Sequence, residues 1–84
     1  MDIAIAEHEL VERMKRFVKA ELKRADLTYE ELAERLREMG FEETKKSIAN
    51  KLSRGTFPAT FFMAVMKAIG RRTVNLEEVW VLCD

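Results

Sequence analysis

The chain has 84 residues, of which 48% are hydrophobic and 36% are charged, and its 15 basic and 15 acidic side chains cancel at pH 7. This length and composition predict one globular domain, residues 1–84, with a single modest core. One Cys and one His exclude an internal disulfide framework and argue against a zinc site, so we expect neither a metal nor a cofactor. The absence of a long apolar run or a secretory signal favours a cytoplasmic protein.

The charges are distributed unevenly along the chain. Residues 1–43 carry a net charge of −4, residues 44–76 carry +7 without a single Asp or Glu, and residues 77–84 carry −3. In a chain with 15 acids, an acid-free stretch of this length favours a surface for a negatively charged partner over an ordinary solvated face that happens to be basic.

The first predicted helix covers residues 7–25. Its apolar side chains recur at spacings of three and four residues, which is typical of an amphipathic helix. They are Leu10, Val11, Met14, Phe17, Val18, Leu22 and Ala25. Residues 1–6 form either a disordered arm or part of a dimer contact.

The second predicted helix covers residues 29–39 and ends at Gly40. Thr28 and Glu31 have the spacing of a capping box, in which each side chain accepts from a backbone amide of the other residue. The inward positions are Leu32, Ala33, Leu36 and Met39. Phe41 is expected to be an apolar anchor in the turn that follows.

The third predicted helix covers residues 45–54, with Thr44 as its N-cap and Gly55 as its stop. Its apolar stripe is narrow, consisting of Ile48, Ala49 and Leu52. The rest of its surface consists of Lys, Ser, Asn and Arg.

Two further helices are predicted at residues 59–69 and 76–82. Pro58 suits the start of the first, whose uniform hydrophobicity predicts the most buried helix of the domain. The run from Val79 to Val81 is equally compatible with a strand. The predicted fold is therefore all-α, a compact four- to five-helix bundle containing a helix-turn-helix.

Several motifs in this order resemble the Cro/phage-repressor (lambda-repressor-like) type of helix-turn-helix domain. The matching positions are Thr28, Glu31-Leu32-Ala33, Ser47-Ile48, Arg54-Gly55, Pro58 and Ile69-Gly70. The run from Asn50 to Phe57 is also similar to a set of small bacterial domains of unassigned function. The chain departs from the repressor pattern in a turn about two residues longer and in Tyr29, where many relatives have Gln.

In a helix-turn-helix, the N-terminal part of the second helix reads base edges in the major groove. At the third predicted helix, the expected base contacts are Lys45, Lys46, Ser47 and Asn50. Lysine suits the O6/N7 edge of guanine, and an amide can bond both N6 and N7 of adenine. The alternative to a base contact is that Asn50 bonds only its own helix or water.

Phosphate contacts fix the register of a protein on DNA without reading its sequence. The candidates are Thr28, Tyr29, Thr44, Lys51, Arg54, Arg71 and Arg72. Five such contacts predict a log–log salt slope of roughly −4 to −5. For the arginines the alternative is bonding to the last carbonyls of a helix, and for Tyr29 it is covering the start of its helix.

The sequence therefore predicts sequence-specific binding of double-stranded DNA by a transcriptional regulator that acts as a homodimer. The first helix or residues 79–82 are the candidate dimer contacts. The alternative function is a protein-interaction module, antitoxin- or adaptor-like, whose basic face binds an acidic partner. No nucleophile–base pair, metal cluster or Gly-rich phosphate loop points to an enzyme, and no small-molecule ligand is indicated.

Overall fold

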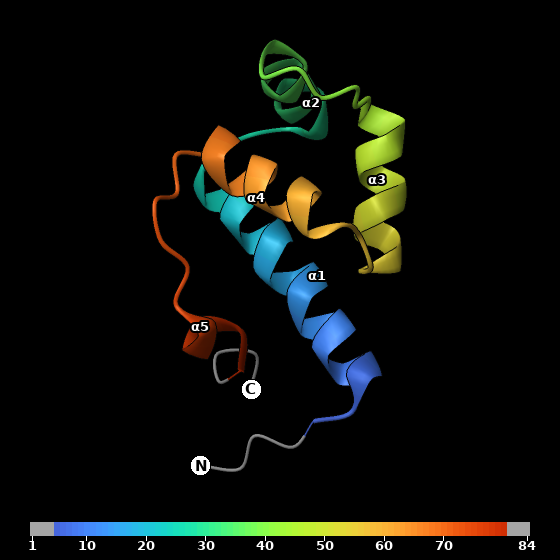
Figure 1. Ribbon diagram of the computed structural model, residues 1–84, viewed down its shortest axis with the longest axis vertical. Coiled ribbons are helices and arrows are strands. Elements are labelled where there is room, and N and C mark those ends of the chain that lie inside the picture. The colour runs from blue at the N-terminus through green and yellow to red at the C-terminus, as the bar shows by residue number, and fades with distance from the viewer. Residues whose placement is uncertain (1–4, 81–84) are drawn as a thin grey trace.

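The computed structural model describes residues 5–80, which form helices and connecting turns but no strand. The helices are α1 (Glu7–Arg24), α2 (Tyr29–Glu38), α3 (Lys45–Arg54), α4 (Ala59–Ala68) and α5 (Leu76–Trp80) (Figure 1). The predicted all-α fold of five helices is confirmed, and every helix begins where the sequence predicted. The first, second and fourth helices end one residue earlier than predicted. Val79 and Trp80 are helical rather than extended, and the expected helix end at residue 82 lies outside the described residues.

Helix α1 crosses the molecule obliquely, and the other helices are arranged around it (Figure 1). Helices α2 and α3 pack against each other, and Figure 1 shows α2 almost end-on while α3 runs vertically, so the pair crosses steeply. Helix α3 also packs on α1, α2 packs on α4, and α5 returns to the N-terminal half of α1. Helix α3 is thereby held from two sides and leaves its remaining surface to solvent.

The core is built from the predicted apolar faces. The largest fully buried side chains come from all four long helices and are Val18, Leu32, Leu36, Ile48, Leu52 and Val65. An aromatic cluster extends this core, since the rings of Phe57 and Phe61 meet edge to face with centroids 5.3 Å apart. Edge-to-face pairs at this separation add to the stabilisation that burial provides.

Three apolar positions differ from the prediction. Met39 and Phe41, expected inside, are 40% and 37% exposed, because the chain leaves α2 at Met39 and both side chains lie on the outside of the turn to α3. Met63 is 66% exposed, so α4 is buried on one face and not all round. Glu21, by contrast, is a charged residue that is buried on the apolar face of α1.

The helix ends follow the predicted capping signals. The Thr28–Glu31 capping box is present, with the Thr28 amide donating to Glu31 Oε1 and the Glu31 amide donating to Thr28 Oγ1. Gly55 ends α3 in the left-handed region at φ 73°. A Cβ at Gly55 would lie 2.6 Å from side-chain atoms of Val11 and Lys15, so glycine also permits the close approach of α1.

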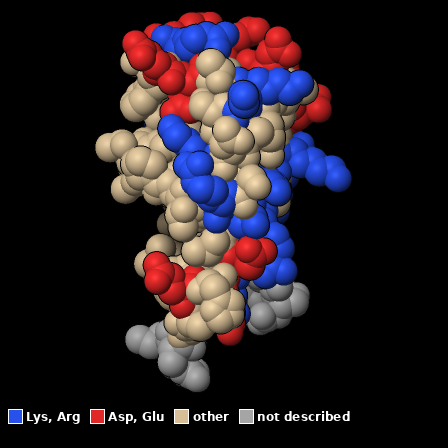
Figure 2. All heavy atoms as spheres, turned by 90° about the vertical axis from the view of Figure 1, so that its right-hand side faces the viewer, with Lys and Arg blue, Asp and Glu red and all other residues tan. Residues whose placement is uncertain are grey.

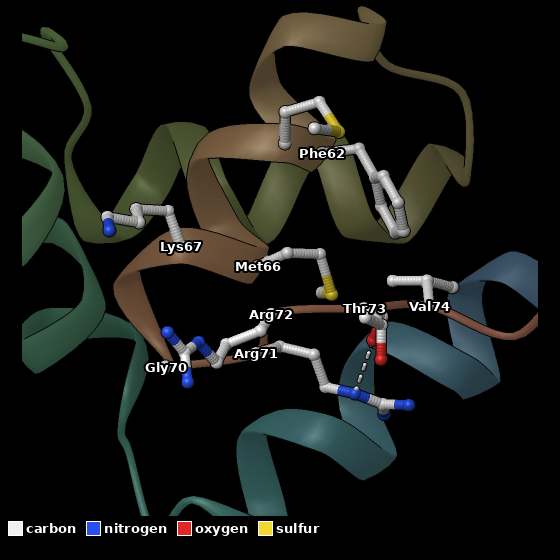
Figure 3. Close-up of a pocket in the computed structure, with 9 residues that line it drawn as sticks. Phe62, Met66, Lys67, Gly70, Arg71, Arg72, Thr73 and Val74 are labelled. Atoms are coloured by element: carbon white, nitrogen blue, oxygen red, sulfur yellow. Dashed lines mark hydrogen bonds between the residues drawn. The ribbon is translucent and has the colours of Figure 1, made fainter.

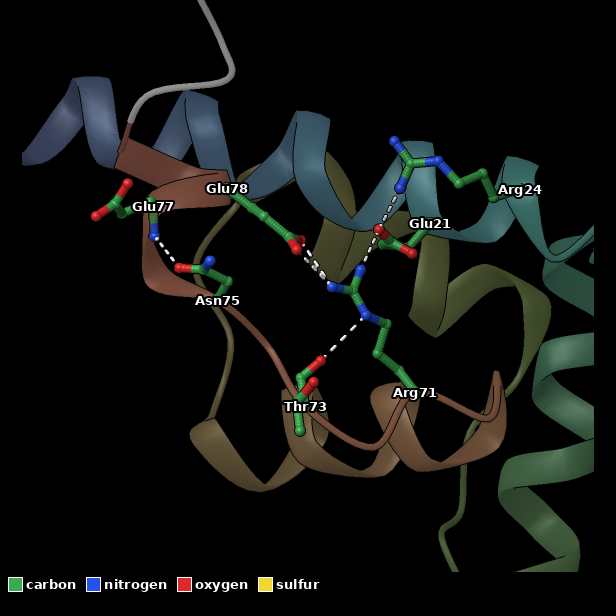
Figure 4. A network of polar contacts seen from close by, with 7 residues as sticks. All are labelled: Glu21, Arg24, Arg71, Thr73, Asn75, Glu77 and Glu78. Atoms are coloured by element: carbon green, nitrogen blue, oxygen red, sulfur yellow. Dashed lines mark hydrogen bonds and ion pairs between the residues drawn. The ribbon is translucent and has the colours of Figure 1, made fainter.

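A polar network attaches α5 to the rest of the domain (Figure 4). Arg71, in the linker after α4, donates to the buried Glu21 of α1, to both carboxylate oxygens of Glu78 in α5 and to the Thr73 carbonyl. These carboxylates raise the pKa of Arg71 above its ordinary value, with the hydrogen bonds to Glu78 as the largest cause. Arg13 of α1 adds a bond to the Trp80 carbonyl.

Replacing Leu32 by Ala should lower the free energy of unfolding by about 2–5 kcal/mol, because the removed atoms leave a cavity in a close-packed core. Leu32 is fully buried, whereas Leu76 is 69% exposed and provides a matched control. Leu76→Ala should change stability by less than about 0.5 kcal/mol. Urea denaturation followed by circular dichroism measures both, and equal effects would contradict the assigned core.

The pKa of Glu31 lies below its ordinary value of 4.5, chiefly because its carboxylate accepts from the Thr28 backbone amide. A lowered folded-state pKa gives stability that is present above the unfolded pKa and lost as the pH falls through the folded one. Glu31→Gln should therefore have a lower melting temperature than the parent chain at pH 7. The difference between the two melting temperatures should shrink as the pH falls from 7 to 2, and a difference that stays constant over this range would contradict this role.

Candidate nucleic-acid interface

Helix α3 has one buried side and an opposite side that is exposed. Ile48 and Leu52 are fully buried against α1 and α2. By helical geometry, Lys46, Asn50 and Ser53 lie opposite this buried stripe, and all three are exposed. The sequence thus predicted correctly which stripe of α3 is buried, and the opposite side remains available for a partner.

The outward surface of α3 is basic. Lys45, Lys46 and Arg54 are exposed, and none of them pairs with a carboxylate of the described residues. Figure 2, which faces α3, shows Lys and Arg side chains running down the middle of this side, with Asp and Glu gathered toward its upper and lower ends. Lys45, Lys46 and Asn50 are therefore all exposed on α3, and Lys46 and Asn50 share its outward side.

A buried carboxylate lies beside α3. Glu43 is 7% exposed, and its Oε1 accepts from Ser47 Oγ at 2.7 Å while its Oε2 accepts from Lys51 Nζ. Its backbone carbonyl accepts from Arg37 of α2 at 2.9 Å. Glu43 therefore bonds to both α2 and α3 from the turn that joins them.

Two of the predicted contact residues on α3 already have internal partners. Ser47 completes a second capping box, because the Thr44 amide donates to Ser47 Oγ and the Ser47 amide donates to Thr44 Oγ1. Lys51 pairs with Glu43, and its ammonium lies 4.7 Å from the centre of the Phe61 ring. A base contact by Ser47 or a phosphate contact by Lys51 would compete with these bonds.

The two arginines after α4 are separated from α3. Arg71 is bound by Glu21 and Glu78, with its guanidinium 5.6 Å from the Phe17 ring, so its role in the structure is to hold α5. Arg72 is exposed beyond the C-terminal end of α4, whereas α3 lies beside the N-terminal end (Figure 1). Neither arginine joins the basic surface of α3.

The backbone amides of Thr28 and Thr44, two of the predicted phosphate contacts, already have partners within the chain. The Thr28 amide donates to the Glu31 carboxylate. Both Glu30 and Glu31 lie in the first turn of α2, and Tyr29 packs against the core. The two carboxylates at this end of α2 would repel a phosphate.

At the start of α3, the Thr44 amide is bonded to Ser47, and the first turn carries no acid. The amides of Lys45 and Lys46 are the remaining donors there.

Sequence reasoning missed Glu43 and Glu21 as partners of these cations. Glu21 had a readable signal, since it follows Phe17 and Val18 at spacings of four and three residues and so falls on the apolar face. Glu43 had no such signal, because an acid before an N-cap is common. Its partner Lys51 lies eight residues further on, beyond the three- and four-residue spacings of helical neighbours. No buried side-chain polar atom in the described range lacks a hydrogen-bond partner.

Comparison with known proteins identifies a family. The family model described as a domain of unknown function, DUF6471, matches residues 10–74, which is most of the chain. The chain belongs to the DUF6471 family. The match includes α2, α3 and α4 in full and therefore every helix that shapes the basic surface. No curated protein and no solved structure matches the chain.

The described part of this DUF6471 chain contains no grouping of three or more His, Cys, Asp or Glu side chains suited to a metal ion. Within the same residues, none of the helices has the length and apolarity needed to cross a bilayer.

Replacing Glu43 by Ala should lower the free energy of unfolding by about 1–3 kcal/mol, because it removes a buried acceptor from Ser47 and Lys51. Glu42→Ala is the matched control, since Glu42 is exposed and adjacent, and it should change stability by less than about 0.5 kcal/mol. Urea denaturation measures both. Equal stabilities of the two variants would contradict a structural role for the Glu43 carboxylate.

Proposed function

We propose that this chain binds double-stranded DNA through α3 and acts as a transcriptional regulator. The observation that carries the proposal is the exposed surface of α3, where Lys45, Lys46 and Arg54 have no carboxylate partner among the described residues and Asn50 lies beside them. A cationic helix without nearby acids suits a polyanion, and Asn50 adds an amide able to read an adenine edge.

The neutralisation of Glu43 supports the same proposal. An acid so close to the start of α3 would repel phosphates if it were exposed and unpaired. Here it is buried and paired with Lys51, so its charge is compensated within the protein. The three remaining cations of α3 are the ones that would meet DNA.

The proposed contacts on DNA follow from the position of each side chain on α3. Lys46 and Asn50, one turn apart on the outward side, would face the base edges. Lys45 and Arg54 would contact phosphates at either end of the helix, with the amides of the first turn as further donors. The two phosphate contacts by Lys45 and Arg54 predict a log–log salt slope of about −2 per bound protomer, shallower than five contacts would give.

The proposed active form is a homodimer. A single short helix buries little surface, and paired half-sites are the usual way for such proteins to gain affinity. Val79 is buried within the chain itself, so the outer side of α1 is the better candidate for the dimer contact. Of the other predicted contact, residues 81 and 82 lie outside the described range.

Lys46→Glu should abolish binding to a random-sequence duplex, since it places an acid where a phosphate or base edge is expected. Lys67→Glu is the matched control, because Lys67 belongs to the same acid-free segment but lies on α4, away from α3. Fluorescence anisotropy across a salt series measures both, with circular dichroism confirming the fold. Equal losses in the two variants, or no binding by the parent chain, would contradict the proposal.

Asn50→Ala should relax sequence preference and cost about 1–3 kcal/mol at a selected site. Selection of bound sequences from a random duplex pool provides that site, and a palindromic result would support the dimer. Weak duplex binding that neither Lys46 nor Asn50 influences would instead favour the protein-interaction module.

A further inference from the structure

A pocket of about 500 Å³ lies between α4 and the linker of residues 70–75 (Figure 3). Its walls include Phe62, Met63, Met66, Lys67, Arg72 and Val74. This volume is within the range of small-molecule sites, which are concave, mostly apolar and equipped with a few polar groups. The linker leaves the C-terminal end of α4, so the pocket is remote from the basic surface of α3 (Figure 1).

The floor of the pocket is apolar and belongs to the core. Met66 is 4% exposed, and Phe62 and Val74 pack against the buried cluster. Met63 stands at the rim and is 66% exposed, although it is a large apolar side chain. Methionine adapts its shape readily, which suits the contact surface of a flexible apolar ligand.

The polar groups of the pocket are cationic. Three basic side chains line it, Lys67, Arg71 and Arg72, and no carboxylate does. The Arg71 guanidinium is bound by Glu21 and Glu78, and Figure 3 shows it turned toward Thr73. Lys67 and Arg72 are exposed and have no carboxylate partner among the described residues. The rim therefore carries two uncompensated positive charges beside an apolar floor.

We propose that this pocket binds a small amphipathic carboxylate, one carboxylate attached to a short alkyl or aryl group. The apolar part would cover Phe62, Met66 and Val74, and the carboxylate would pair with Lys67 and Arg72. A polyphosphate would leave the apolar floor uncovered, and a cationic ligand would meet like charges. The site is independent of the proposed DNA surface, since it shares no residue with α3.

Octanoate is a suitable probe, titrated below its micelle concentration into the full chain and followed by amide chemical shifts. With ten non-hydrogen atoms, it should bind with a dissociation constant of about 1–5 mM. The shifts should concentrate in residues 62–74. Acetate, which lacks the tail, and octylammonium, which reverses the charge, should each bind at least about threefold more weakly.

Combined Lys67→Ala and Arg72→Ala should weaken octanoate binding about three- to tenfold, as expected for the loss of two exposed ion pairs. The matched control is the combined Lys45→Ala and Lys46→Ala on α3, which removes the same charge and should leave octanoate binding unchanged. The Lys45/Lys46 variant should lose DNA binding, and the Lys67/Arg72 variant should retain it. The two proposals can therefore fail separately.

Three outcomes would overturn the inference. These are octylammonium binding as tightly as octanoate, chemical shift changes that map outside residues 62–74, and octanoate binding by the Lys67/Arg72 variant that equals binding by the parent chain. Each variant replaces exposed side chains, and a thermal melt verifies that it folds. Lys67→Ala alone serves as a second variant if the double variant is unstable.

Discussion

The position of α3 depends on the buried carboxylate of Glu43. It accepts from Ser47 in the first turn of α3 and from Lys51 one turn further on, while its backbone carbonyl accepts from Arg37 of α2. A buried carboxylate is tolerated when it is paired and fully hydrogen-bonded. Burial of Ile48 and Leu52 attaches α3 to the core, and the hydrogen bonds to Glu43 fix the orientation of the helix.

Glu21 plays the corresponding part on α1, beside the linker that leads to α5. It is the other buried acid of the described residues, and it holds Arg71, which in turn holds Glu78 of α5. The cations of the acid-free segment, residues 44–76, therefore fall into paired and unpaired groups. Two of its cations are neutralised inside the fold, and the remainder form separate groups on α3 and beside the pocket, each available to a different anion.

The sequence by itself determined where the helices begin and end and which side of each one is buried. Thr28 and Thr44 cap helices, Gly55 ends one, and Pro58 precedes another, because the requirements of the first and last turns are met by neighbouring residues. The buried stripe of Ile48 and Leu52 could also be predicted from local sequence, since residues three or four positions apart share one side of a helix.

Only the tertiary structure decided which cations remain free. Arg71 and Glu21 are 50 residues apart in the chain, so no local pattern could predict their pairing. The exposure of Met39 and the hollow beside α4 likewise depend on how whole helices pack, not on their own residues. Charge counts along the sequence give the sign of a segment, but burial and long-range partners set how much of that charge reaches the surface.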